Sequence, residues 1–195
     1  MPQRSPVLAL LGLVLGLTAA FLALDLIEYA YARIGIAPGW IVALLAASLL
    51  GSPINLPLGR MRGGDAVLAV NLGGGVIPTG LSLYLLLTHA PTGAALAGVL
   101  IVALAVHRLA RPVPGVGIAV PLLAPPLIAA AAALLLAPDT APSVAYIAGT
   151  LGTLIGADLA NLRRLASLGG PVASIGGAGT FDGIFVTGIL AVLLA

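Results

Sequence analysis

The stretch Gly156–Phe185, GADLANLRRLASLGGPVASIGGAGTFDGIF, joins the last two apolar runs of the chain. Asp158 lies near the end of one run, Asp182 lies near the start of the next, and Arg163 and Arg164 stand between them. An apolar run that ends in arginines is typical of a membrane span that ends at the cytoplasmic face. A carboxylate within such a span costs at least ~2.5 kcal/mol and indicates a functional site. This stretch therefore predicts both a membrane fold and a candidate site.

The composition also indicates a membrane protein. The chain has 195 residues, of which 61% are hydrophobic and 7% are charged, whereas a soluble domain has about 25% charged residues. A net charge of +2 on scattered arginines gives no basis for nucleic-acid binding. Cysteine is absent, and His89 and His107 lack close ligand-type neighbours in the sequence, so we expect no metal and no cofactor. The predicted partner is the lipid bilayer of the plasma membrane.

Apolar segments of about 17 to 25 residues, enough to cross a bilayer, recur along the chain. The first follows Arg4 and resembles a signal peptide, but no small-x-small cleavage site precedes Asp25, so we interpret it as a transmembrane helix. The predicted fold class is all-α: a single transmembrane domain over residues 1–195, a polytopic helical bundle of about seven membrane helices, some broken by glycine and proline. The expected spans are 6–24, 37–58, 66–88, 92–107, 114–137, 142–160 and 173–195.

The arginines predict the orientation of this bundle. With seven crossings, every arginine except Arg33 falls on the side of the N-terminus, while Asp25, Glu28 and Asp139 fall on the other side. The positive-inside rule then places the N-terminus in the cytoplasm and the C-terminal Ala195 outside.

Polar groups and Gly/Pro breaks collect in the cytoplasmic third of the predicted bundle. Broken backbone at membrane depth lines a cavity or is buried in protein, although close helix packing or a kink also explains such glycines. The hydroxyls of the outer half, among them Thr150 and Thr153, can bond to carbonyls of their own helix and need no function. Besides the two aspartates, the candidate substrate-binding residues are Asn55, Asp65, Asn71, Gly73, Gly74, Gly75 and Gly179.

Two small-residue motifs accompany the aspartates. Gly152 and Gly156 precede Asp158, and Gly179 and Gly183 flank Asp182 at the same four-residue spacing. Because such motifs let membrane helices approach closely, we expect the two aspartate-bearing helices to pack together. Two carboxylates held close share a proton and can act as acid and base on one water, or bind a proton or cation in a transporter.

The chain from about Gly51 onward resembles an uncharacterised bacterial and archaeal membrane family, domain of unknown function 1614. The motifs NLGGGVIP, PVPGVGIAVP, GADLANL and SIGGAGTFDGIF carry this resemblance, which implies no activity.

The chain is also loosely similar to the intramembrane aspartyl proteases of the presenilin and signal-peptide-peptidase group. That resemblance implies catalytic aspartates on the sixth and seventh helices near the cytoplasmic side, where Asp158 and Asp182 match in order and depth. Three features depart from the pattern. Ala157 replaces the tyrosine before the first aspartate, two extra residues separate the glycine motif from Asp182, and the later Pro-Ala-Leu helix has no counterpart.

Three functions follow from these patterns. The first is a diaspartyl hydrolase that acts on a peptide or small-molecule substrate, with Asp158 and Asp182 as the catalytic pair. The second is a transporter or channel for an ion or small solute. The third is a non-catalytic membrane protein whose aspartates cap helices or pair with Arg163 or Arg164. The one-sided distribution of polar groups favours the first, because alternating access prefers a site near the midplane. Oligomerisation stays open.

Overall fold

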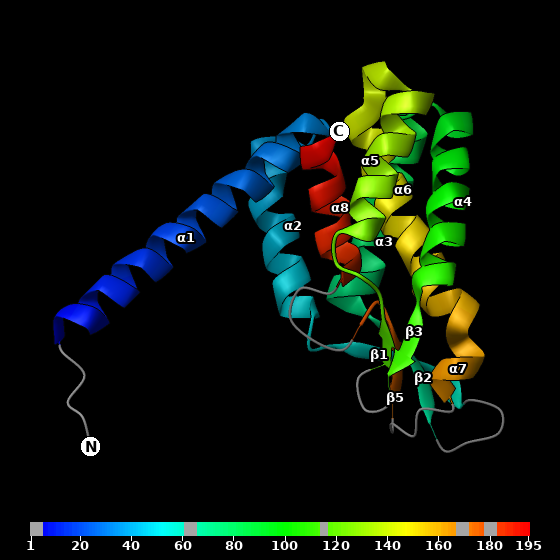
Figure 1. Ribbon diagram of the computed structural model, residues 1–195, viewed down its shortest axis with the longest axis horizontal. Coiled ribbons are helices and arrows are strands. Elements are labelled where there is room, and N and C mark those ends of the chain that lie inside the picture. The colour runs from blue at the N-terminus through cyan, green and yellow to red at the C-terminus, as the bar shows by residue number, and fades with distance from the viewer. Residues whose placement is uncertain (1–5, 61–65, 114–116, 167–171, 178–182) are drawn as a thin grey trace.

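The protein is mostly helical. The computed structural model describes residues 6–60, 66–113, 117–166, 172–177 and 183–195. Most helices stand side by side in one bundle, from which the first helix leaves at an angle (Figure 1). The helices are α1 (Pro6–Arg33), α2 (Pro38–Gly51), α3 (Ile77–Thr88), α4 (Thr92–Leu109), α5 (Ala124–Leu136), α6 (Ala141–Thr153), α7 (Leu162–Ala166) and α8 (Gly183–Leu194). Two π-turns, η1 (Leu72–Val76) and η3 (Leu154–Asp158), and two 3₁₀ turns, η2 (Pro138–Thr140) and η4 (Leu159–Asn161), adjoin them.

Three helical stretches of the described chain are long and apolar enough to cross a membrane: Gly12–Arg33, Thr92–Leu109 and Pro138–Arg164. The other apolar helices have 10–17 residues, which at 1.5 Å per residue gives at most about 26 Å. The hydrocarbon core of a bilayer is ~30 Å thick. The prediction of seven transmembrane helices is therefore wrong, and the chain is a multi-pass membrane protein with three candidate spans.

Strands occupy the ends of several predicted spans, which corrects the all-α prediction. They are β1 (Asn55–Arg60), β2 (Val67–Asn71), β3 (Arg111–Val113), β4 (Gly117–Ala119) and β5 (Val172–Ile175). Valine and isoleucine favour extended backbone, and Pro53, Pro112 and Pro121 oppose a continuous helix at these places. In short apolar runs of this kind, the sequence pattern is the same for a strand and for a buried helix.

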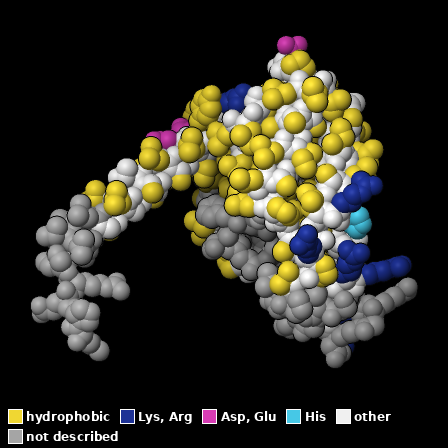
Figure 2. Space-filling view, in the orientation of Figure 1, with side chains coloured by type: hydrophobic (Ala, Val, Ile, Leu, Met, Phe, Trp, Pro, Cys, Tyr) yellow, Lys and Arg dark blue, Asp and Glu magenta, His cyan; other side chains and the backbone are white. Residues whose placement is uncertain are grey.

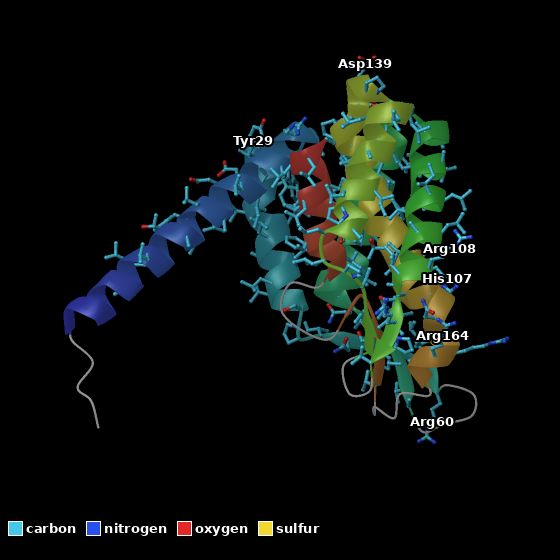
Figure 3. All side chains as sticks on the ribbon, in the orientation of Figure 1. Tyr29, Arg60, His107, Arg108, Asp139 and Arg164 are labelled. Carbon is cyan, nitrogen blue, oxygen red and sulfur yellow. The ribbon has the colours of Figure 1, made fainter. Side chains whose placement is uncertain are left out.

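The strands form two small sheets at one end of the bundle (Figure 1). In the first, β2 lies between β1, with which it pairs antiparallel, and β5, with which it pairs parallel. The second is the antiparallel hairpin of β3 and β4. Arg60 and Arg164 lie at this end, Asp139 lies at the opposite end, and Arg108 lies between them in the last turn of α4 (Figure 3). We call the two ends the arginine end and the Asp139 end.

Helix α6 lies at the centre of the bundle and packs against α3, α4, α5 and α8. Gly152 and Gly156 face α4: a Cβ atom on Gly156 would lie 2.4 Å from the carbonyl oxygen of Ala103. Helices α6 and α8 pack together as predicted, but through Gly149 and Gly188. The prediction that the Gly152 motif faces the helix of Asp182 is therefore wrong.

The outside of the molecule is apolar. Hydrophobic side chains cover the visible face of the bundle and much of α1 (Figure 2). Only 6% of the apolar segment of α1 is buried inside the protein. Large side chains such as Leu15, Leu87 and Leu135 are also exposed. So much exposed apolar surface indicates contact with a lipid bilayer.

Candidate functional site

Asp158 lies on a π-turn that interrupts the central helix. After Thr153, residues Leu154–Asp158 form η3, and the backbone N–H of Leu159 reaches the carbonyls of both Leu154 and Ile155. A π-turn pairs residues five apart, so it brings Asp158 onto the helix face of Thr153, five positions earlier. In a regular α-helix the two side chains would point about 140° apart.

The Asp158 carboxylate reaches the turn that follows β5. Its Oδ2 accepts a hydrogen bond of 2.7 Å from the backbone N–H of Gly176. Gly176 has φ +81°, and a Cβ atom there would lie 2.5 Å from the Cα of Gly75. Because only glycine fits this turn, the close packing of Gly176 on Gly75 fixes the donor that Asp158 binds.

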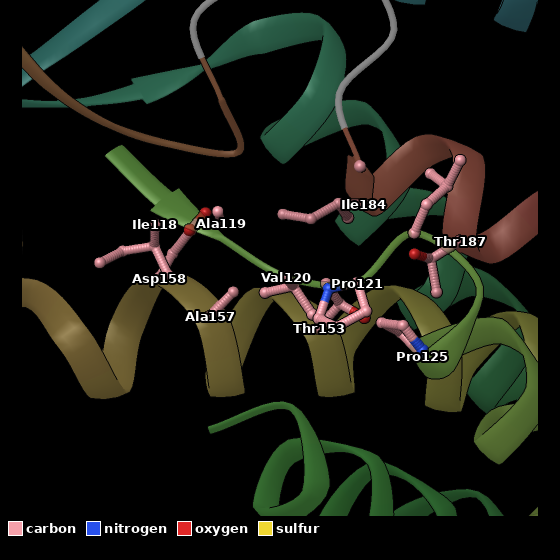
Figure 4. Close-up of a pocket in the computed structure, with 12 residues that line it drawn as sticks. Ile118, Ala119, Val120, Pro121, Pro125, Thr153, Ala157, Asp158, Ile184 and Thr187 are labelled. Carbon is pink, nitrogen blue, oxygen red and sulfur yellow. The ribbon is translucent and has the colours of Figure 1, made fainter. Parts of the chain in front are cut away.

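Asp158 also lines a cavity of about 260 Å³ between α5, α6 and α8 (Figure 4). Thr153 and Thr187 line the same cavity and are only 5% and 3% exposed. The Thr153 hydroxyl is buried and makes no hydrogen bond to any described residue. In its described part, the cavity, here called the Asp158 pocket, thus combines one carboxylate with two buried hydroxyls.

Asn161 holds the broken end of α6 in place. Its Nδ2 donates to the carbonyls of Gly156 and Ala157, at 2.9 and 3.0 Å, and lies 3.4 Å from Nδ1 of His107. Arg164 Nη1 donates to Asn161 Oδ1 at 3.2 Å. Such bonds to carbonyls at a helix break fix the position of the backbone around Asp158.

A second polar cluster lies between the three strands of the larger sheet. Asn71 is fully buried, and its Nδ2 donates to the Ser52 carbonyl and to Asn55 Oδ1, at 2.7 and 3.1 Å. Its Oδ1 accepts the backbone N–H of Gly74 at 2.8 Å. Ser174 Oγ, from β5, donates to Asn55 Oδ1 at 2.6 Å. The Asn71 amide therefore has bonds at both its nitrogen and its oxygen.

The glycines of η1 are packed against backbone on two sides. A Cβ atom on Gly73 would lie 2.0 Å from the Ser48 carbonyl oxygen in α2. A Cβ atom on Gly75 would lie 3.1 Å from the carbonyl oxygen of Ile175. The absence of side chains thus lets η1 pack between α2 and the end of β5.

The structure brings most described candidate residues into one region. Asn55, Asn71 and the glycines 73–75 form one cluster, and Gly176, which packs on Gly75, joins it to Asp158. Asp65, Gly179 and Asp182 lie outside the described residues. One half of the predicted aspartate pair is therefore described.

The sequence interpretation missed two residues of the Asp158 pocket. The sequence pattern places Thr153 in the outer half of the bundle, where hydroxyls need no function, and does not single out Thr187, yet both line the pocket with Asp158. The five-residue spacing from Thr153 to Asp158 is a signal only if a π-turn is expected there. Within the described ranges, no group of three or more His, Cys, Asp or Glu side chains could hold a metal ion.

Comparison with known proteins gives one result. No curated protein and no solved structure gives a significant match to the chain. Residues 40–194, which include every strand and all helices from α3 to α8, match the family described as protein of unknown function, DUF1614. The chain belongs to the DUF1614 family, and its candidate site lies within the matched residues.

Proposed function

We propose that this protein is a plasma-membrane transport protein that binds a proton or a small monovalent cation in the Asp158 pocket. The observation that carries the proposal is the lining of that pocket by one carboxylate and the buried hydroxyls of Thr153 and Thr187. Among the described residues that line the pocket, Asp158 has the one charged side chain, and its carboxylate can balance one positive charge. Buried hydroxyls also tend to find a partner, which a bound cation or water would supply to Thr153.

The interrupted helix beside the pocket supports the same function. Helix α6 changes to a π-turn at Leu154, and Thr153, Ala157 and Asp158 on either side of this change line the pocket. Secondary transporters bind their ions where helices are interrupted and backbone groups face a cavity. On the positive-inside rule, the arginine end, where this pocket lies, would face the cytoplasm.

Binding and flux in proteoliposomes test this function. The full chain is reconstituted, and uptake of radioactive sodium and movement of protons, read with an internal pH dye, are measured against protein-free vesicles. We expect movement of one of the two ions, and we expect Asp158→Asn to abolish it. Asp139→Asn is the matched control, since Asp139 lies at the opposite end (Figure 3). Wild-type vesicles that move neither ion would contradict the proposal.

A second candidate function is hydrolysis by an aspartate pair. In the sequence Asp182 immediately precedes Gly183, which lines the Asp158 pocket. In this function Asp158 and Asp182 would act as acid and base on one water. Asn55, Asn71, the glycines 73–75, Gly179 and Asp65 would bind a peptide or small-molecule substrate.

Cysteine cross-linking separates the two functions without a known substrate. The chain contains no cysteine, so a double variant reports only the introduced thiols. A disulfide requires Cα atoms within about 7 Å. If Asp158→Cys with Asp182→Cys forms a disulfide, while Asp158→Cys with Asp139→Cys does not, the aspartates are close enough to be a pair. If the Asp158→Cys and Asp182→Cys thiols do not cross-link, the hydrolase function is ruled out.

A further inference from the structure

We infer that the outer face of α4 binds an anionic phospholipid. The acyl chains of this lipid lie along exposed leucines of the helix, and its phosphate group binds the arginines where the helix ends. This surface, here called the α4 lipid site, is separate from the Asp158 pocket and does not depend on the proposed transport function.

An exposed apolar stripe runs along α4 and leads to an arginine. Leu96, Leu100 and Leu104 are 52%, 60% and 50% exposed, and Arg108 follows at the same four-residue spacing. Residues four apart lie on one face of a helix. From Leu96 to Arg108 the helix rises about 18 Å, close to half of the ~30 Å hydrocarbon core of a bilayer. An acyl chain can therefore lie along the stripe while its head group reaches Arg108.

Basic side chains gather where α4 ends. His107 and Arg108 belong to its last turn, and Arg111 begins β3 two residues after the helix. Arg163 and Arg164 follow on α7, and all four arginines are exposed. Arg108 and Arg164 lie on either side of His107 along one edge of the molecule (Figure 3), where Figure 2 shows a group of basic side chains. Because α4, β3 and α7 contain no acidic residue, this edge attracts anions.

Asn161 links the two helices that carry this cluster. Its Oδ1 accepts a hydrogen bond of 3.2 Å from Arg164 Nη1, and its Nδ2 lies 3.4 Å from Nδ1 of His107. With an amide N–H group facing Nδ1, the neutral imidazole carries its proton on Nε2. The Nε2–H group can then donate to an oxygen of the bound phosphate beside the arginines.

The combination of stripe and cluster favours a lipid over a soluble anion. A guanidinium group binds two phosphate oxygens at once, but phosphate from solution makes no use of the leucines. A zwitterionic phospholipid brings its own cation next to the arginines, which repel it. A phospholipid with net negative charge satisfies both parts, and basic clusters at a membrane surface bind such lipids in other proteins.

A tryptophan on the leucine stripe reports which lipid lies there. The chain has one tryptophan, so Trp40→Phe with Leu104→Trp gives a single reporter in the full chain. The protein is reconstituted in vesicles of equal parts phosphatidylglycerol and phosphatidylcholine, with one of the two lipids brominated to quench fluorescence. We expect brominated phosphatidylglycerol to quench more strongly. Arg108→Gln should lower this preference about fivefold, the effect of one arginine near a membrane surface.

A matched control removes the same charge elsewhere. Arg60→Gln changes an arginine of β1 that lies far from His107 along the molecule (Figure 3), so the preference should stay unchanged. A reporter at Leu135, which is 85% exposed near the end of α5, should show no preference. Arg111→Gln is a second test variant, expected to give a similar loss if Arg108→Gln melts earlier in detergent than the wild type.

Three outcomes would overturn the inference. Equal quenching by the two lipids at the Leu104→Trp reporter would show that no anionic lipid binds there. An equal loss of preference in Arg60→Gln and Arg108→Gln would show that net charge, and not this site, attracts the lipid. If inorganic phosphate abolishes the preference while sodium chloride of the same ionic strength does not, the cluster binds a soluble anion instead. None of these outcomes depends on ion movement, so failure of the transport function stays distinguishable.

Discussion

The two π-turns use the same backbone irregularity for different purposes. Both lie next to strands, and both place a polar side chain at their edge, Asn71 at η1 and Asp158 at η3. Asn71 is fully buried, its amide is bonded at both atoms, and the glycines beside it are packed against backbone. Asp158 is half-buried and faces a cavity together with Thr153, which makes no hydrogen bond to any described residue.

The difference shows how a structural break and a functional site can be told apart. Where the irregular backbone and its polar side chain satisfy each other, the break serves the packing of the fold. Where a buried hydroxyl at a cavity has no partner among the described residues, as Thr153 has none, a ligand or water can supply one. We therefore expect substitutions at η1 to affect stability and substitutions at η3 to affect binding and transport.

The largest effect is expected from Gly73→Ala. The new methyl group would lie 2.0 Å from the Ser48 carbonyl and 2.6 Å from the Ser52 nitrogen, and overpacking of this kind costs up to about 3 kcal/mol or more. We expect a large drop in melting temperature in detergent. Gly80→Ala is the control, because a Cβ atom there meets nothing within 4 Å. Equal melting temperatures for the two variants would mean that η1 does not pack as described.

A smaller loss is expected from Asn71→Ala. The change leaves the Gly74 N–H and the Ser52 carbonyl without the partner that now binds them, at a cost of about 2 kcal/mol. The free energy of unfolding in mixed micelles measures this cost. The variant Asn55→Ala should lose less unfolding free energy, because the Asn55 side chain shares the cluster but is less buried. A larger loss for Asn55→Ala than for Asn71→Ala would show that Asn55 organises η1.

Thr153→Val should stabilise the protein. The Thr153 hydroxyl is buried without a partner among the described residues, and valine has nearly the same shape without the polar atom. Removal of an unpaired buried hydroxyl is expected to gain about 1 kcal/mol. Thr187→Val, in the same pocket, provides the comparison. Loss of stability in Thr153→Val would show that an ordered water or ion already binds that hydroxyl.

The sequence predicted the parts of this structure that follow from charge and solvation. Burial of carboxylates and amides in an apolar chain is costly, which singled out Asp158, Asn55 and Asn71 before their positions were known. The arginines on alternate connections predicted that Arg60, Arg108 and Arg164 would share one side. Arg60 and Arg164 lie at the end opposite Asp139, and Arg108 lies between the two ends (Figure 3).

The rest depends on backbone geometry that side-chain pattern does not report. The sequence pattern of the runs Val67–Asn71 and Val172–Ile175 fits a helix as well as a strand. Their hydrogen-bonded pairing with each other makes them strands. The face that Gly156 presents, and the place of Thr153 beside Asp158, depend on where α6 leaves the α-helical register. A single inserted π-turn changes both without a change in composition.

The smallest effect on stability, with the largest effect on function, is expected from Asp158→Asn. Asparagine keeps an oxygen that can accept the Gly176 N–H and has nearly the same shape, so we expect a change of less than about 1 kcal/mol in unfolding free energy. Loss of the negative charge removes the group that would balance a bound cation. The signal that the wild type gives, either heat on titration with sodium chloride or proton flux in vesicles, should therefore be lost in a protein that melts like the wild type. If Asp158→Asn instead melts as early as Asn71→Ala and still moves ions, η3 serves packing as η1 does. The two π-turns would then have the same structural role and would differ only in the elements that pack around them.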